Sequence, residues 1–224
     1  AKQALSLEAY CLIALCHPDE ALDLLAHEPY TYLPSEPLIA SAWQMKGRPE
    51  KAVSVLQAGI YQNFLSLLSQ MSSYLDLCTD RPDTFRETWK RICILADVFQ
   101  VEQLNPGVFL STYLKCAYGF LIQNDNTSAL DVLEKYVRCA CGNIYPLHLH
   151  GDRYFDQLDD WLSHCLDLGG APPRNDAAIR QDIVSSVTEN PAFLSMKDNP
   201  RFCALTLELS KLADPDSQQG GSTE

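Results

Sequence analysis

The stretch WQMKGRPEKAVSVL at residues 43–56 decides the fold, because it contains the end of one helix, a tight turn and the start of a second helix. A large apolar residue is followed by Ala nine positions later and by Leu four positions after that. The chain repeats this spacing at Leu12–Ala21–Leu25, Trp43–Ala52–Leu56 and Phe120–Ala129–Leu133. The small Ala leaves room where the two helices of a pair touch. Helical hairpins repeated in this way stack into solenoids, so the sequence predicts an all-α, tetratricopeptide-like solenoid of helical hairpins.

Four helical pairs are expected from this pattern together with the apolar periodicity. Their predicted bounds are 2–16 with 18–28, 36–46 with 49–59, 60–78 with 82–99, and 106–123 with 127–141. Gly47 is expected to adopt a positive φ angle in its turn, because glycine does so at little cost. Asn105 before Pro106 is expected to cap the helix that follows. The third pair is irregular, and Phe85 stands there in the place of the small residue.

The repeat pattern ends near Gly142, which predicts three regions along the chain. Residues 1–142 form the stacked repeats, 143–213 form an irregular helical cap packed on them, and 214–224 form a disordered tail. Within the cap we expect a loop at 142–151 and helices at 152–166, 175–188 and 200–213. The repeated Asn-Pro at 190–191 and 199–200 predicts two capped helix starts.

The charge balance argues against direct binding of nucleic acid. The chain of 224 residues has 17 Lys and Arg against 29 Asp and Glu, a formal net charge of −12, whereas DNA binding depends on cationic side chains. Nine cysteines, with no visible signal peptide and no apolar run long enough to cross a membrane, predict a reduced, cytoplasmic protein without disulfides. Because the chain begins at Ala1 inside a predicted helix, we also expect it to be a fragment of a longer protein.

The sequence contains none of the common catalytic motifs that we considered. The sequence has no nucleophile elbow, no phosphate-binding glycine loop with Lys, no dinucleotide fingerprint and no zinc-protease motif. These absences predict a protein that is not an enzyme and uses no cofactor. Function is therefore expected on a binding surface.

One cluster of residues resembles a metal site. Cys139 and Cys141 are followed by His148 and His150, and two thiolates with two imidazoles could surround a zinc ion. Their spacings are tighter than those of usual zinc ligands, and Cys139 fits the apolar face of a helix, so packing is the favoured interpretation. A redox pair of the two cysteines is a further alternative. Asp152 is expected to cap the helix that follows it.

A ligand surface is predicted from the position two residues before each large apolar anchor. In a stack of helical pairs this position lies on the concave face, and here it carries tyrosine or serine. The candidate ligand-binding residues are Tyr10, Ser41 and Tyr118, with Gln44 and Gln70 as polar neighbours; if Asp80 marks the third turn, the equivalent position there is Tyr74. Tyrosine offers apolar area together with one hydroxyl, which suits a peptide or a small amphipathic ligand. The alternative is that these side chains pack between neighbouring helices.

Most of the chain, up to about Leu212, resembles the C-terminal region of Cro/cI-type helix-turn-helix transcriptional regulators (XRE family) from Gram-positive bacteria. The resemblance rests on the order and spacing of short phrases, which are YLDLC (74–78), FRET (85–88), ALDVLE (129–134), LHGDRYFD (149–156) and NPAF (190–193). It implies a tetratricopeptide-like region that dimerises the regulator and senses a signal. Related regulators bind signalling peptides on the concave face.

The chain departs from the family pattern in one respect, because residues 1–28 already form the first predicted repeat and no helix-turn-helix domain is present. DNA binding would therefore belong to a missing N-terminal domain. The functional prediction is a sensor and dimerisation domain, a homodimer that binds a peptide, a small molecule or a partner protein. The alternative is a general protein-interaction scaffold unrelated to transcription.

Overall fold

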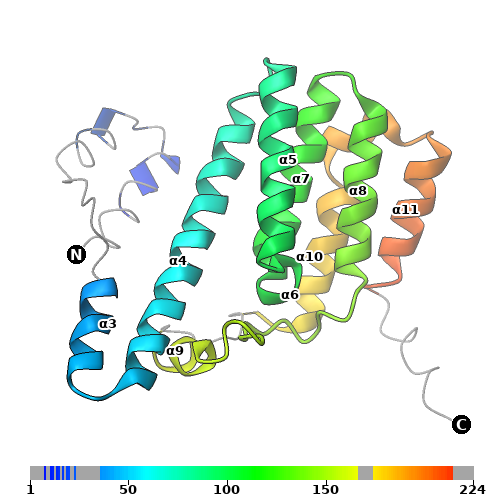
Figure 1. Ribbon diagram of the computed structural model, residues 1–224. Coiled ribbons are helices and arrows are strands. Elements are labelled where there is room, and N and C mark those ends of the chain that lie inside the picture. The colour runs from blue at the N-terminus through cyan, green and yellow to red at the C-terminus, as the bar shows by residue number, and fades with distance from the viewer. Residues whose placement is uncertain are drawn as a thin grey trace, which may run out of the picture.

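The computed structural model describes residues 36–165 and 174–213, together with single positions between 8 and 23, and every regular element in the two long ranges is helical. The chain is therefore all-α throughout these ranges, as predicted (Figure 1). The elements are α3 (Glu36–Met45), α4 (Pro49–Asp76), α5 (Pro82–Val98), α6 (Val101–Leu104), α7 (Pro106–Ile122), α8 (Asn126–Ala140), α9 (Leu158–Cys165), α10 (Asp176–Thr188), a 3₁₀ helix η1 (Pro191–Met196) and α11 (Pro200–Ser210).

Local sequence signals account for most helix starts and turns. Gly47 has a φ of 67°, which confirms the expected left-handed turn between α3 and α4. The side chain of Asn105 accepts a hydrogen bond from the backbone N–H of Val108 and so caps α7, as predicted. Asn190 caps η1 and Asn199 caps α11 in the same way, each followed by a proline in the first turn.

The predicted break between residues 59 and 60 is wrong, because α4 continues without interruption from Pro49 to Asp76. The sequence has no proline between Pro49 and Pro82, and a glycine alone does not end a helix that has packing partners on both sides of it. Gly59 instead permits a close approach: a Cβ atom there would lie 2.7 Å from the Cγ atom of Glu36 at the start of α3. The second helix of one predicted pair and the first helix of the next are therefore one rod.

Two further bounds differ from the prediction. The helix expected over 152–166 begins only at Leu158, because the carboxylate of Asp152 accepts the backbone N–H groups of Tyr154 and Phe155 at 2.8 Å each and closes a turn before the helix. The last helix ends at Ser210, and residues 211–213 form turns and a bend. The predicted pair 2–16 and 18–28, apart from single positions, and the tail 214–224 lie outside the described residues.

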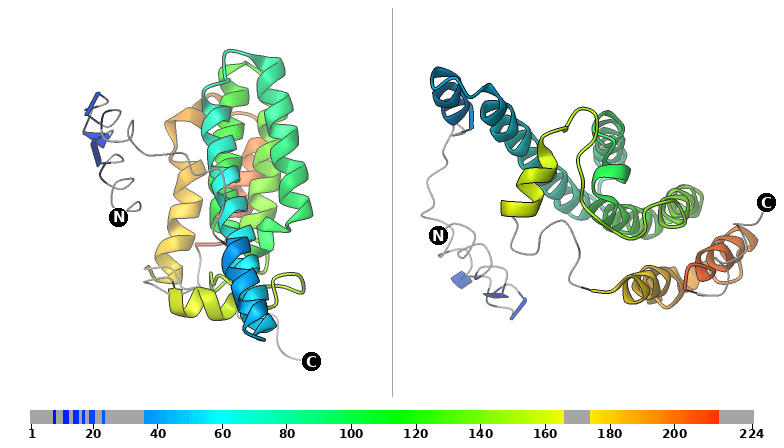
Figure 2. Two further views of the ribbon diagram at one scale, coloured as in Figure 1. Left: turned by 60° about the vertical axis from the view of Figure 1, so that its left-hand side comes forward. Right: turned by 90° about the horizontal axis from the view of Figure 1, so that it is seen from below.

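The longer helices from α3 to α8 pack mainly as antiparallel neighbours, whereas α9 lies against α4 (Figure 1). Helix α3 lies beside the first part of α4, the upper part of α4 contacts both α5 and α7, and α7 and α8 form a hairpin against which α11 packs (Figures 1 and 2). A continuous core joins α4, α5, α7, α8, α10 and α11. None of the helices in the described ranges is long and apolar enough to cross a membrane.

Phe85 replaces the small residue in the third pair, and the neighbouring helix makes room for it. Its ring is fully buried and meets Phe120 edge to face, with 5.0 Å between the ring centroids. A Cβ atom at Gly119 of α7 would overlap with the Phe85 ring. At this contact the large residue, Phe85, therefore stands on α5, and the small residue, Gly119, stands on α7.

A second, smaller core surrounds the middle of α4 on the side of α9. Tyr61 of α4 meets Phe155 and Trp161 edge to face, with ring centroids 5.9 and 6.4 Å apart. Gln57, one turn before Tyr61 on α4, makes three hydrogen bonds to the loop that precedes α9. Its amide nitrogen donates to the carbonyl of Tyr154 and to the carboxylate of Asp156, and its amide oxygen accepts from the backbone N–H of Gln157, each at 2.8 Å. The loop and α9 thus cover one face of the middle of α4.

Candidate functional site

Helix α4 has more apolar side chains than the two cores bury. One face, which includes Phe64 and Leu68, is buried against α5 and α7. A second apolar stripe has residues exactly one heptad apart, and these side chains remain 38–45% exposed: Val53, Ile60, Leu67 and Tyr74. Residues at this spacing lie on one face of a helix. An exposed apolar stripe along a helix of 28 residues is the pattern of a surface that another helix or peptide can cover.

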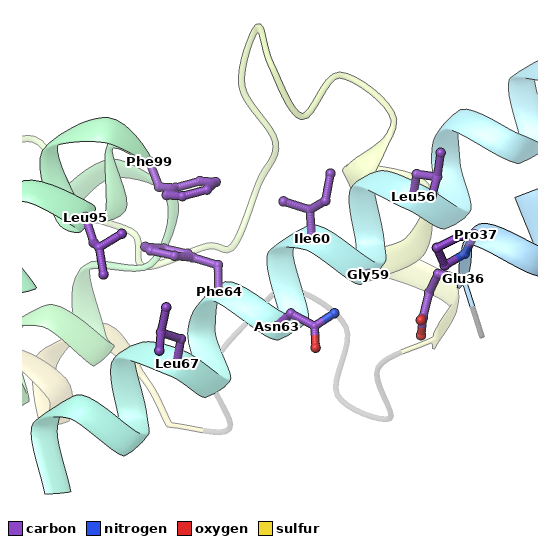
Figure 3. A pocket seen from close by; sticks show the side chains of 10 residues that line it. All are labelled: Glu36, Pro37, Leu56, Gly59, Ile60, Asn63, Phe64, Leu67, Leu95 and Phe99. Carbon is purple, nitrogen blue, oxygen red and sulfur yellow. The ribbon is translucent and has the colours of Figure 1, made fainter. Parts of the chain in front are cut away.

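The middle of this stripe, Ile60 and Leu67, lines an apolar hollow between α4 and α5 with a volume of about 370 Å³ (Figure 3). Phe64 and Phe99 stack at its base, with 4.1 Å between their ring centroids. The lining residues are Glu36, Pro37, Leu56, Gly59, Ile60, Asn63, Phe64, Leu67, Leu95 and Phe99. Because α3 begins at Glu36, it covers α4 only as far as Gly59, and the hollow opens directly beyond its first turn.

A second hollow of about 500 Å³ continues along the same two helices toward their connecting turn. Its lining residues are Met71, Tyr74, Asp83, Thr84, Glu87, Thr88 and Arg91. The α5 wall is polar here, whereas the α4 wall stays apolar. Arg91 donates to Glu87 at 2.9 Å, and this hydrogen bond lowers the pKa of the Glu87 carboxyl. The helical spacing places both hollows on the same face of the two helices, and together they form what we name the α4–α5 groove.

Of the predicted ligand-binding residues that the structure describes, Tyr74 alone lines the groove. The guanidinium of Arg81 lies 6.0 Å from the centroid of the Tyr74 ring. The other candidate on α4, Gln70, is exposed and donates to the hydroxyl of Ser66 at 3.2 Å.

The remaining candidates lie elsewhere. Ser41 and Gln44 are exposed on α3, and the Ser41 hydroxyl donates to the carbonyl of Pro37 at 2.9 Å. Tyr118 is exposed on α7, and Tyr10 lies outside the described residues. Ser41, Gln44 and Tyr118 therefore do not line the groove.

The sequence analysis missed the apolar lining of the groove, of which Ile60, Leu67, Leu95 and Phe99 are the central members. A signal for it existed in the heptad spacing of the stripe on α4. That spacing crosses the break predicted after residue 59, and the interruption concealed it.

The weak metal candidate is only partly assembled. Cys139, His148 and His150 line a common hollow of about 520 Å³, whereas Cys141 does not line it and is exposed. The Nδ1 atom of His150 lies 2.7 Å from the carbonyl oxygen of Gly151. Within residues 36–165 and 174–213, and at the described single positions, no three His, Cys, Asp or Glu side chains are close enough to hold a metal ion.

The buried thiols around this region are held in their protonated form. Burial raises the pKa of Cys139 to about 12 and that of Cys93 to about 11. Burial likewise raises the pKa of Tyr113, whose hydroxyl donates to Glu102. A thiol reacts and binds metals as the thiolate, so these positions favour packing over chemistry.

Comparisons of the chain with protein-family models, with curated proteins and with solved structures found no match.

Proposed function

We propose that this chain is a non-catalytic helical binding module, and that the α4–α5 groove is the surface on which it binds a partner segment. The observation that carries this proposal is the exposed apolar stripe on α4, which runs beside an apolar hollow and continues for the length of the groove. Exposed apolar surface of this kind is unfavourable in water unless a partner covers it.

The groove is a consequence of the fused helix α4. In a regular stack of helical hairpins, the preceding hairpin lies against the face of the next one. Because α4 joins two expected repeat helices in one rod, α3 stays beside the first half of α4 and cannot lie against the second half. Beyond the first turn of α3, no other helix of the described ranges lines the two hollows between α4 and α5.

The resemblance to Cro/cI-type regulators supports a wider role for this module. A ligand in the groove would change the pitch between helices, and in a homodimer it would change the spacing of two attached DNA-binding domains, to which operator half-sites are sensitive. The chain would then serve as the sensor and dimerisation region of a transcriptional regulator, with a peptide, a small molecule or a partner protein as its signal.

A peptide-display selection on the purified chain tests the groove as a binding surface. We expect selected peptides to bind the parent chain and to lose at least about tenfold in affinity for Leu67→Asp, because this change puts a charge in the centre of the apolar stripe. The matched control is Leu207→Asp on α11, since Leu207 is 67% exposed and lies on a helix that does not line the groove.

The two variants separate the possible results. Peptides whose binding falls for Leu67→Asp and is unchanged for Leu207→Asp support the groove. Selected peptides that bind both variants as well as the parent would show that the binding surface lies elsewhere and would refute the proposal. An absence of any enriched peptide would also count against a peptide-binding module.

A further inference from the structure

The shape of the α4–α5 groove and the charges at its ends restrict its occupant. The residues of α4 that line the groove run from Leu56 to Tyr74 and cover about five helical turns, roughly 27 Å at 1.5 Å per residue. A wall whose side chains recur every seven residues matches a partner helix with the same repeat, because two such helices interlock along a shared seam. An extended peptide, with side chains alternating at a period of two, has no such match.

Two acidic side chains mark the ends of the groove. Glu36 lines its lower part, and Asp83 lines its upper part. Among the described residues, neither carboxylate has a cation within ion-pair distance. The one basic residue in the lining, Arg91, is paired with Glu87 at 2.9 Å. The ends of the groove are thus acidic in a chain of net charge −12.

We propose that the groove binds a basic amphipathic helix of a partner protein, about five turns long, with apolar residues at heptad spacing and Lys or Arg at each end. This inference rests on the proposed function of the groove. Asn63 lies between Ile60 and Leu67 on the lining and is the one polar side chain of α4 in it. A polar residue in such a seam selects the register of the incoming helix.

A second copy of this chain fits less well, for an electrostatic reason. If two α4 helices met antiparallel across a two-fold axis, Glu36 of each copy would face Asp83 of the other. If they met in parallel, each acid would face its own equivalent. Both arrangements bring these carboxylates together, and like charges in an interface oppose association. A basic helix neutralises both ends.

The test uses two synthetic peptides of about 20 residues, a length that covers the groove. Both carry Leu at the a and d positions of the heptad; one has Lys at both ends and the other has Glu there. Binding to the purified chain is followed by fluorescence anisotropy. We expect the Lys peptide to bind about tenfold more tightly than the Glu peptide, since each exposed ion pair contributes modestly. Raising the salt concentration should reduce this preference.

Three variants assign the effect to the groove. In the double variant Glu36→Gln with Asp83→Asn, the preference for the Lys peptide should fall to about twofold or less, because its charge partners are gone. Leu67→Asp should weaken both peptides at least about tenfold. Leu207→Asp should change neither. Circular dichroism of each variant checks that its helices have formed.

Several results would overturn the inference. These are equal binding of the two peptides to the parent chain, binding of a scrambled peptide as tight as that of the Lys peptide, and self-association of the chain that Leu67→Asp abolishes, which would make a second copy the occupant. Should display selection yield groove-dependent peptides that are extended or acidic, the proposed function would stand and the basic helix would be refuted.

Discussion

Replacement of Gly119 by alanine tests the exchange of large and small residues between α5 and α7. In an exposed helix interior, Gly→Ala stabilises by about 1 kcal/mol. At Gly119 the new Cβ would overlap with two atoms of the Phe85 ring, well inside the 3.0 Å that real Cβ contacts respect. The ring cannot move aside, because it is fully buried and held by Phe120. Overpacking of this severity costs up to about 3 kcal/mol, so we expect a net loss of about 2 kcal/mol.

The assay is urea unfolding of a double-mutant cycle with Phe85→Leu, which shortens the side chain that causes the overlap. In the Phe85→Leu background, Gly119→Ala should become neutral or stabilising by up to about 1 kcal/mol. Gly107→Ala in the same helix is the matched control, since the nearest atom to its Cβ is the Asn105 side-chain oxygen at 4.0 Å. A Gly119→Ala variant as stable as the parent, or an equal effect in both backgrounds, would refute the packing argument.

Three further predictions concern single side chains. Asp125→Ala should lower the free energy of unfolding by about 1 kcal/mol at neutral pH, because the Asp125 carboxylate caps α8 and accepts hydrogen bonds from Ser128 and Arg86. These hydrogen bonds lower the pKa of Asp125, so its contribution to stability is present above about pH 4 and is lost as the pH falls through the folded-state pKa. Unfolding curves from pH 3 to 7 check this. Gln57→Ala removes three hydrogen bonds to the loop at residues 154–157. It should therefore speed amide hydrogen exchange there and lower the free energy of unfolding by about 1 kcal/mol. Unchanged exchange at residues 154–157 would contradict this prediction. Alkylation by iodoacetamide, followed by mass spectrometry, should modify the exposed Cys203 before Cys139, because Cys139 is buried with a pKa of about 12. Equal rates at the two cysteines would show that α8 opens readily.

Features that depend on neighbouring residues in the sequence could be predicted. The turn at Gly47, the cap at Asn105 and the paired Asn-Pro starts of η1 and α11 each follow from the chemistry of two or three adjacent residues. The apolar periodicity of α7 and α8 likewise placed their ends within a few residues of those observed.

Features that depend on distant contacts could not be predicted in this way. The helix bounds predicted from the sequence separate residues 59 and 60, whereas α4 is continuous there and packs against Glu36 of α3 at Gly59. The groove depends on which face of α4 the core leaves uncovered, and that is decided by α5 and α7 together. For the same reason the repeat register selected Tyr74, which lines the groove, together with Ser41 and Tyr118, which do not line it.

The continuity of α4 also has a mechanical consequence. A helix of 28 residues is about 42 Å long and bends little over that distance. Its second half is fixed between α5 and α7, whereas its first half extends past them and carries α3 (Figure 1). A rotation of about 5° at the point where α4 leaves α5 and α7 displaces the far end by about 2 Å, because the first half of the rod acts as a lever arm of about 21 Å. A small adjustment of packing where an occupant meets α4 is thus amplified into a displacement of α3 and of any segment that precedes it.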